Sequence, residues 1–172
     1  TAATGTCAFL QNGRACGVLM TTGGELLTIG SSGKVVSSIA TGLISVKKLP
    51  DVWLSQGKVM YGVHGVGRYS IFDADRRREL RTIAFTGNAT ASIKGNELVL
   101  MAAEGSRLVR FDQKGNPSDL ASSSSKVFAA YDGAREIFAA ASAGQIDAYD
   151  RSLSSIGGFI SECSDIEFVS AC

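Results

Sequence analysis

Short stretches of alternating hydrophobic and polar residues, each followed by a turn, run along the whole chain of 172 residues. Alternation with a period of two predicts β-strands that bury one face. Four of the predicted turns have the sequences NGR, QGK, KGN and DGAR, whose residues tolerate the positive φ of tight hairpin turns. Helical periodicity is absent from the pattern. The sequence therefore predicts an all-β protein.

One phrase occurs four times, in the segments 24–36, 67–80, 106–120 and 144–156. It consists of a glycine, an apolar strand, a turn and a second strand, and it places Gly30, Asp73, Asp112 and Asp150 at the same position, at intervals of 43, 39 and 38 residues. A period near 40 with four strands per repeat is typical of a β-propeller. We predict one domain, 1–172, with four four-stranded blades at about 7–40, 43–85, 90–122 and 126–160.

The closure of this ring stays open. Residues 165–172 have the pattern of a further strand, which we call the closing strand. Three arrangements fit: a four-bladed ring in which the closing strand braces the first blade, an incomplete five-bladed ring, and a part of a larger propeller. We favour the four-bladed ring, because an open edge would be prone to aggregation unless a partner covered it.

The repeated phrase, best seen in GELLTIGSSGKVV and GQIDAYD, resembles the repeats of the quinoprotein-like propellers. That family includes pyrroloquinoline-quinone dehydrogenases and non-enzymatic scaffold propellers. The enzymes hold their quinone between an aromatic residue and a disulfide of adjacent cysteines, whereas this chain has a single tryptophan, Trp53, and no adjacent cysteines. The resemblance therefore implies a scaffold-type propeller without a cofactor.

Four cysteines lie near the two ends of the chain, as the pairs Cys7 and Cys16, and Cys163 and Cys172. Their even number favours disulfides in an oxidising compartment, and three connectivities are open. A bridge between the ends would close a loop of some 150 residues, nominally worth about 4 to 5 kcal/mol. The spacing does not suit a zinc site. We expect an extracytoplasmic location: secreted, periplasmic or in an organelle lumen.

Composition narrows the classes of partner. The formal net charge is +1 and 19% of the residues are charged, so nothing in the overall charge calls for nucleic acid or a membrane surface. No apolar stretch approaches the roughly 18 residues that a transmembrane helix needs. Because the chain opens without methionine, we expect a mature or excised form. Peripheral contact with a membrane complex remains compatible with this composition.

The recurring aspartates and the only histidine are the candidates for chemistry. We interpret Asp73, Asp112 and Asp150 as turn residues that accept hydrogen bonds from backbone N–H groups, because a carboxylate after a strand commonly does so. We expect His64 in a loop, where it has no recognisable nucleophile motif beside it. The sequence therefore assigns no catalytic, cofactor or metal residue, and an enzyme using His64 is the least favoured reading.

Two surface features complete the candidates. A basic patch at Arg76, Arg77 and Arg78 falls in a predicted turn and suits an acidic protein surface or an anionic membrane. The triplet Asn88-Ala89-Thr90 fits an N-glycosylation acceptor in a predicted loop. We predict a non-enzymatic scaffold that binds other proteins of a larger assembly. The alternative is a glycan- or small-ligand-binding propeller, which should repeat an aromatic residue in the loops of each blade.

Overall fold

The structure is a computed structural model of the 172-residue chain. It describes residues 3–11, 14–43, 50–94, 97–104, 107–122, 128–132, 137–142, 145–150 and 154–160. The chain divides into two compact units, Thr1–Ala84 and Phe85–Cys172, and each unit contains two antiparallel sheets. The assignment of a single domain stays a prediction.

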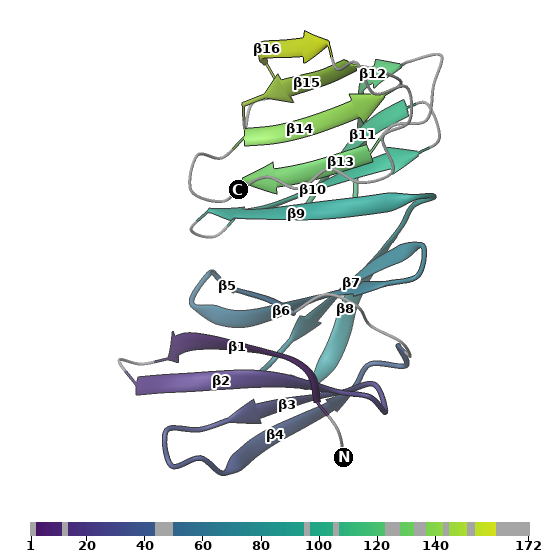
Figure 1. The fold of residues 1–172 in the computed structure, drawn as a ribbon. Coiled ribbons are helices and arrows are strands. Elements are labelled where there is room, and N and C mark those ends of the chain that lie inside the picture. Colours follow the sequence, from purple (N-terminus) through teal and green to yellow (C-terminus); the bar gives the residue numbers. More distant parts are fainter. Residues whose placement is uncertain are drawn as a thin grey trace. The chain divides into compact units, whose positions relative to one another are not determined.

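Each sheet has four strands that pair in the order of the sequence (Figure 1). The first sheet contains β1 (Ala3–Gln11), β2 (Arg14–Thr21), β3 (Glu25–Ile29) and β4 (Val35–Ala40). The second contains β5 (Asp51–Ser55), β6 (Lys58–Gly65), β7 (Arg68–Asp73) and β8 (Arg78–Ala84). The third contains β9 (Asn88–Lys94), β10 (Glu97–Glu104), β11 (Arg107–Asp112) and β12 (Pro117–Ser122), and the fourth β13 (Phe128–Asp132), β14 (Ile137–Ser142), β15 (Gln145–Tyr149) and β16 (Ser155–Ile160). The predicted four sheets of four strands are confirmed.

The first strand of each sheet lies on the inside of its unit. In the first unit β1 contacts β5, and in the second unit β13 contacts β9. The fourth strand lies at the opposite edge of each sheet, and in β8 every residue except Ile83 is exposed. Neighbouring first strands and solvent-exposed fourth strands are the arrangement of propeller blades.

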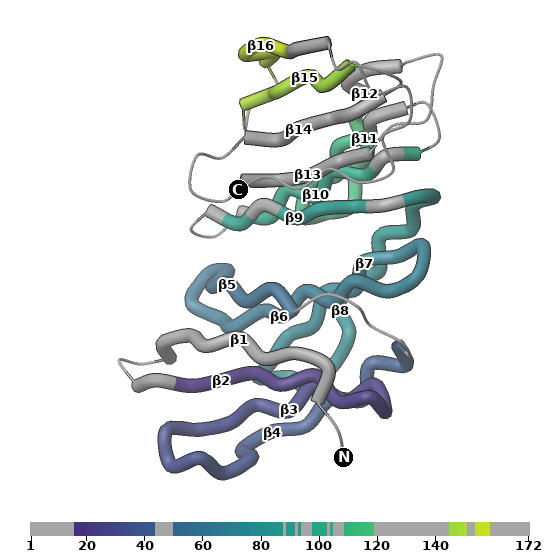
Figure 2. Tube along the Cα trace, in the orientation of Figure 1, coloured from purple at the N-terminus to yellow at the C-terminus, as the bar shows by residue number. Residues whose placement is uncertain are grey.

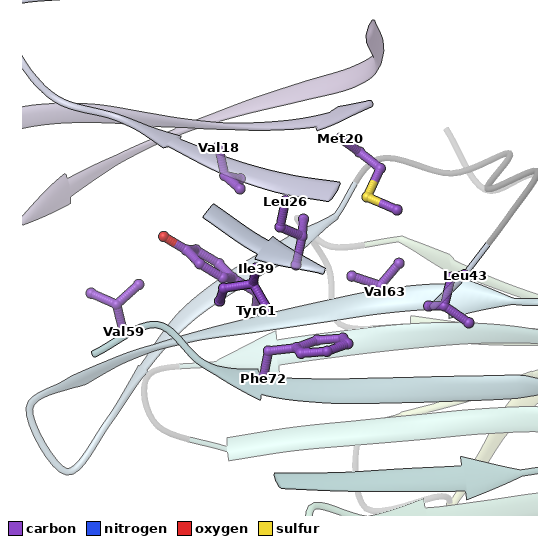
Figure 3. Close-up of a cluster of buried hydrophobic side chains, with 9 residues drawn as sticks. All are labelled: Val18, Met20, Leu26, Ile39, Leu43, Val59, Tyr61, Val63 and Phe72. Atoms are coloured by element: carbon purple, nitrogen blue, oxygen red, sulfur yellow. The ribbon is translucent and has the colours of Figure 1, made fainter. Parts of the chain in front are cut away.

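The core of the first unit forms between its two sheets (Figure 3). Alternate residues of β6, namely Val59, Tyr61 and Val63, point into it, as the period-two pattern predicts. The other members are Val18, Met20, Leu26, Ile39, Leu43 and Phe72. The hydroxyl of Tyr61 lies 2.7 Å from Oγ1 of Thr28, so the polar end of this buried ring is hydrogen-bonded. Burial raises the pKa of Tyr61 above 10.0, which keeps the phenol protonated.

The hairpins show why the turn residues stand where they do. The backbone runs through β5, β6, β7 and β8 as one meander (Figure 2). Between β5 and β6, Gln56 and Gly57 have φ angles of 52° and 76°, which two-residue hairpin turns require. The predicted QGK turn is confirmed. The corresponding NGR, KGN and DGAR turns include residues outside the described part of the chain.

One expectation about elements needs correction and another remains open. His64 lies in β6 and pairs with Tyr69, so the strand extends into the segment predicted as a loop. The closing strand 165–172 falls outside the described residues. Pro117 opens the edge strand β12, at a position where an edge strand tolerates a missing N–H.

Candidate functional site

The recurring aspartates are turn residues, as predicted. Oδ1 of Asp73 accepts hydrogen bonds of 3.0 Å from the backbone N–H groups of Asp75 and Arg76. Oδ1 of Asp112 accepts 2.8 Å bonds from the N–H groups of Lys114 and Asn116. Oδ1 of Asp150 accepts a 2.9 Å bond from the N–H of Ser154. These carboxylates therefore hold the turns that lead into the fourth strands.

The position of Gly30 shows that the turn itself does not need the carboxylate. The N–H of Gly30 donates to the carbonyl of Lys34 at 2.9 Å. The N–H groups of Asp112 and Asp150 make the same bond to the residue four positions on, at 3.2 and 3.0 Å. The backbone turn is thus common to the three repeats, and the carboxylate adds hydrogen bonds to it.

The charge of Asp112 is stabilised by this geometry. Burial alone would raise the pKa of Asp112, but the backbone and side-chain hydrogen bonds from Asn116, together with the backbone bond and charge of Lys114, outweigh it and lower the pKa below 3.8. The folded protein therefore favours the ionised carboxylate.

A second group of polar residues joins three strands of the second sheet. The phenol of Tyr69 on β7 donates a 2.7 Å hydrogen bond to Oδ2 of Asp51 on β5. Nε2 of His64 on β6 lies 3.5 Å from the same oxygen. The rings of His64 and Tyr69 meet edge to face, with centroids 4.7 Å apart and an interplanar angle of 75°. We call these three residues the Asp51–His64–Tyr69 cluster.

The cluster is largely enclosed but not sealed. Tyr69 is fully buried, while the side chains of His64 and Asp51 are 11% and 29% exposed. Burial, followed by the charge of Asp51 and the hydrogen bond to it, raises the pKa of Tyr69 well above 10.0. The phenol therefore keeps its proton and remains a donor to the carboxylate, which is held in one orientation.

Gly62 makes room for the cluster. It pairs with Asp51 on one side, and the ring of Tyr69 crosses above it to reach the carboxylate. A Cβ atom at this position would lie 1.8 Å from the hydroxyl oxygen of Tyr69 and 2.4 Å from Cζ. Only glycine fits beneath the ring.

The basic patch lies at the junction of the β7–β8 turn and β8: Arg76 and Arg77 belong to the turn, whereas Arg78, also predicted in the turn, begins β8. Arg76, Arg77 and Arg78 are all exposed, and Arg77 has a φ angle of 53° at the tip. Nε of Arg76 lies 3.8 Å from Oδ2 of the buried Asp73. Within the described segments, no acidic side chain pairs with Arg77 or Arg78. The guanidinium groups of Arg77 and Arg78 are therefore exposed to solvent, next to a turn that the hydrogen bonds of Asp73 hold in place.

Only two of the four cysteines, Cys7 and Cys16, lie in the described part of the chain. Cys16 is a free cysteine, and the described part of the chain contains no disulfide. In the β1–β2 register Cys7 pairs with Val18 and Cys16 with Phe9, so the two cysteines occupy diagonal positions, typically about 7–8 Å apart between Cα atoms. Disulfides usually need about 4.4–6.8 Å. This register disfavours a Cys7–Cys16 bridge, while Cys163 and Cys172 lie outside the described residues.

The glycosylation candidate is placed differently from expectation. Asn88 begins β9 and pairs with Ala103, whereas the sequence predicted a loop. The acceptor pattern itself stays a prediction.

A shallow pocket lies on the third sheet. It is lined by Leu98, Val99, Arg110, Asp112, Gln113 and Lys114. This lining contains no aromatic residue, so the pocket lacks the feature that the glycan-binding alternative predicts.

Two general findings bear on function. Within the described ranges, no three residues of histidine, cysteine, aspartate or glutamate come together as metal ligands. No helix in that part of the chain is long and apolar enough to cross a membrane.

Comparison with known proteins adds the fold. No family model matches the sequence, and no curated protein matches it. A crystal structure of BBS1N in complex with ARL6DN, soaked with lead, matches with a TM-score of 0.66 at 14% identity, over 94% of this chain and 53% of BBS1N. The same complex soaked with mercury matches with a TM-score of 0.65 at 15% identity, over 94% of this chain and 55% of BBS1N. Dihydro-heme d1 dehydrogenase NirN in complex with DHE matches with a TM-score of 0.62 at 14% identity, over 89% of this chain and 36% of NirN.

BBS1N and NirN are both propeller-fold proteins. The fold is a β-propeller. The chain spans about half of the length of BBS1N and a smaller share of NirN, so its four sheets correspond to part of those propellers. Identities this low show the fold alone, and the finer assignment to the quinoprotein-like repeats remains a prediction.

The sequence reasoning missed Asp51 and Tyr69. Both lie in short strands, and their relation to His64 depends on the register of β5, β6 and β7, which no local motif encodes. The one available signal was Gly62, a glycine within a strand, since such a glycine often marks a close approach of another group.

We expect Asp112→Asn to lower the free energy of unfolding at neutral pH by less than about 1 kcal/mol, because solvent screens this largely exposed charge. Since folding lowers the pKa of Asp112, its stabilising effect is fully present above 3.8 and is lost as the pH falls below that value. Urea denaturation of both proteins between neutral and acidic pH measures this. A difference that persisted unchanged in acid would contradict the role of the charge.

We expect Gly62→Ala to destabilise the protein by about 1–3 kcal/mol, because the added methyl group would displace the ring of Tyr69. Gly23→Ala is the control, since a Cβ there meets only Oγ1 of Thr21 at 3.7 Å. Thermal and urea unfolding compare the two variants. Equal stability of both would show that Tyr69 does not occupy the space above Gly62.

Proposed function

We propose that this chain is a non-enzymatic propeller scaffold that binds another protein through the basic turn between β7 and β8. The observation that carries the proposal is the exposure of Arg77 and Arg78 without an acidic partner within the described segments. Arginine is enriched at the centres of protein interfaces because its planar guanidinium group pairs with carboxylates in a fixed geometry. An acidic protein surface is the partner that this turn fits.

The rigidity of the turn supports this function. Asp73 is only 1% exposed, and its carboxylate bonds the N–H groups of Asp75 and Arg76. A fixed backbone reduces the conformational entropy that binding must remove. The turn therefore presents its arginines in a largely prepared arrangement.

Known propellers are compatible with both binding and catalysis. BBS1N is described in complex with another protein, ARL6DN, which supports a protein partner for this chain. NirN is named as a dehydrogenase. Our proposal of a non-enzymatic function without a cofactor rests on this chain's own residues: His64 faces the carboxylate of Asp51 and the ring of Tyr69 instead of a serine or cysteine nucleophile.

The double substitution Arg77→Glu and Arg78→Glu tests the proposal. We expect it to reduce cross-linked or co-purified partner from the native source by about tenfold or more, because it converts attraction to an acidic surface into repulsion. Lys34→Glu with Lys58→Glu is the matched control, since both lysines are exposed, Lys34 just before β4 and Lys58 at the start of β6, and the change in charge is equal.

Equal retention of the partner by both double variants would contradict the proposal. Their unfolding temperatures are measured alongside, so that a loss of binding is not confused with a loss of folding.

The proposed location is an extracytoplasmic oxidising compartment, and it rests on the cysteine pattern together with the proposed scaffold type of quinoprotein-like propeller. Since the β1–β2 register disfavours a Cys7–Cys16 bridge, we expect Cys7 and Cys16 to pair with Cys163 and Cys172. Peptide mapping of the native protein under non-reducing conditions, with thiols blocked at lysis, measures the connectivity. Four free thiols would contradict both the bridges and the compartment.

A further inference from the structure

The gap between His64 and Asp51 has the dimensions of a metal site. Their facing atoms, Nε2 and Oδ2, are 3.5 Å apart, which is longer than an ordinary hydrogen bond of about 2.7–3.2 Å. Two ligand atoms on one tetrahedral zinc ion, at bond lengths of about 2.0–2.2 Å, lie about 3.3–3.6 Å apart. One ion between the two side chains would therefore bond both without a change in their separation.

The imidazole of His64 has only a long contact with its polar neighbour. Its Nε2 lies 3.5 Å from Oδ2 of Asp51, although the side chain is only 11% exposed. Its ring is held in place by the edge-to-face contact with Tyr69. A neutral imidazole nitrogen facing a carboxylate oxygen is a donor pair that suits zinc and similar ions.

Tyr69 supplies the support that metal ligands usually have. Its phenol donates to Oδ2 of Asp51 at 2.7 Å from a fully buried position. Hydrogen bonds of this kind orient a ligating carboxylate and are typical of the groups that surround bound metals. The side chain of Asp51 is 29% exposed, so the cluster is in contact with solvent.

We propose that Asp51 and His64 bind a divalent transition-metal ion, zinc or one of similar preference, with Tyr69 orienting the carboxylate and water completing the coordination. Two protein ligands make an open and exchangeable site. This is independent of the basic turn, so either proposal can fail without the other.

The test uses the fact that His64 is the only histidine of the chain. The NMR resonances of its imidazole therefore report zinc binding at this site and distinguish it from zinc binding by the four cysteines. On titration with Zn²⁺ we expect the nitrogen resonance of Nε2 to shift and saturate, while Mg²⁺, which prefers oxygen ligands, leaves it unchanged.

Variants assign the ligands. Asp51→Asn should weaken the zinc-dependent shift by at least about tenfold in affinity, and Tyr69→Phe should weaken it less while the ring of residue 69 still supports His64. Asp75→Asn, which removes an exposed carboxylate elsewhere in the second sheet's turn, is the control and should bind as the unmodified protein does.

Two results would overturn the proposal. The first is an imidazole spectrum that does not respond to millimolar Zn²⁺. The second is a response of equal affinity in Asp51→Asn and in the unmodified protein, which would show binding to the histidine alone. Circular dichroism of each variant confirms that it is folded before it is titrated.

Discussion

The need to cover both faces of its middle strands governs this protein. In β6 every residue from Val59 to Val63 is buried, so this strand does not have the half-exposed pattern of a surface strand. Its odd-numbered residues enter the core of the first unit, and Met60 and Gly62 lie on the opposite face. A blade with two apolar faces cannot be stable alone, which is why such sheets occur in repeated arrays.

The burial of the middle strands also restricts where charged and polar side chains can lie. The exposed fourth strand β8 carries Arg78, Glu79 and Arg81, whereas the buried stretch Val59–Val63 of the middle strand β6 carries no charge. In the second sheet the buried phenol of Tyr69 donates a hydrogen bond to Asp51, and Gly62 leaves the space through which the ring passes. A buried polar network of this kind tolerates no unmatched member, since an unsatisfied buried group costs about 1–3 kcal/mol.

The repeated phrase was sufficient to predict the sheets, and the physical reason is local. Period-two alternation, hairpin turns and aspartates that bind the next turn are all encoded within a few residues, so Asp112 could be assigned as a turn residue without a structure. The Asp51–His64–Tyr69 cluster could not, because it depends on the register of three strands. A shift of one residue would turn His64 to the other face of the sheet. The same limit explains Asn88, which begins β9, where pairing with the neighbouring strand decides the boundary.

The charges of β8 have a structural explanation that competes with docking. An exposed edge strand risks pairing with another chain, and charged side chains prevent this. Arg78, Glu79 and Arg81 could serve that purpose alone, whereas Arg77 does not belong to the strand. Its φ of 53° is a conformation that costs a residue other than glycine roughly 1–2 kcal/mol. The backbone thus disfavours arginine at the tip, and edge protection does not require it, so its side chain is the part of the basic patch that binding best explains.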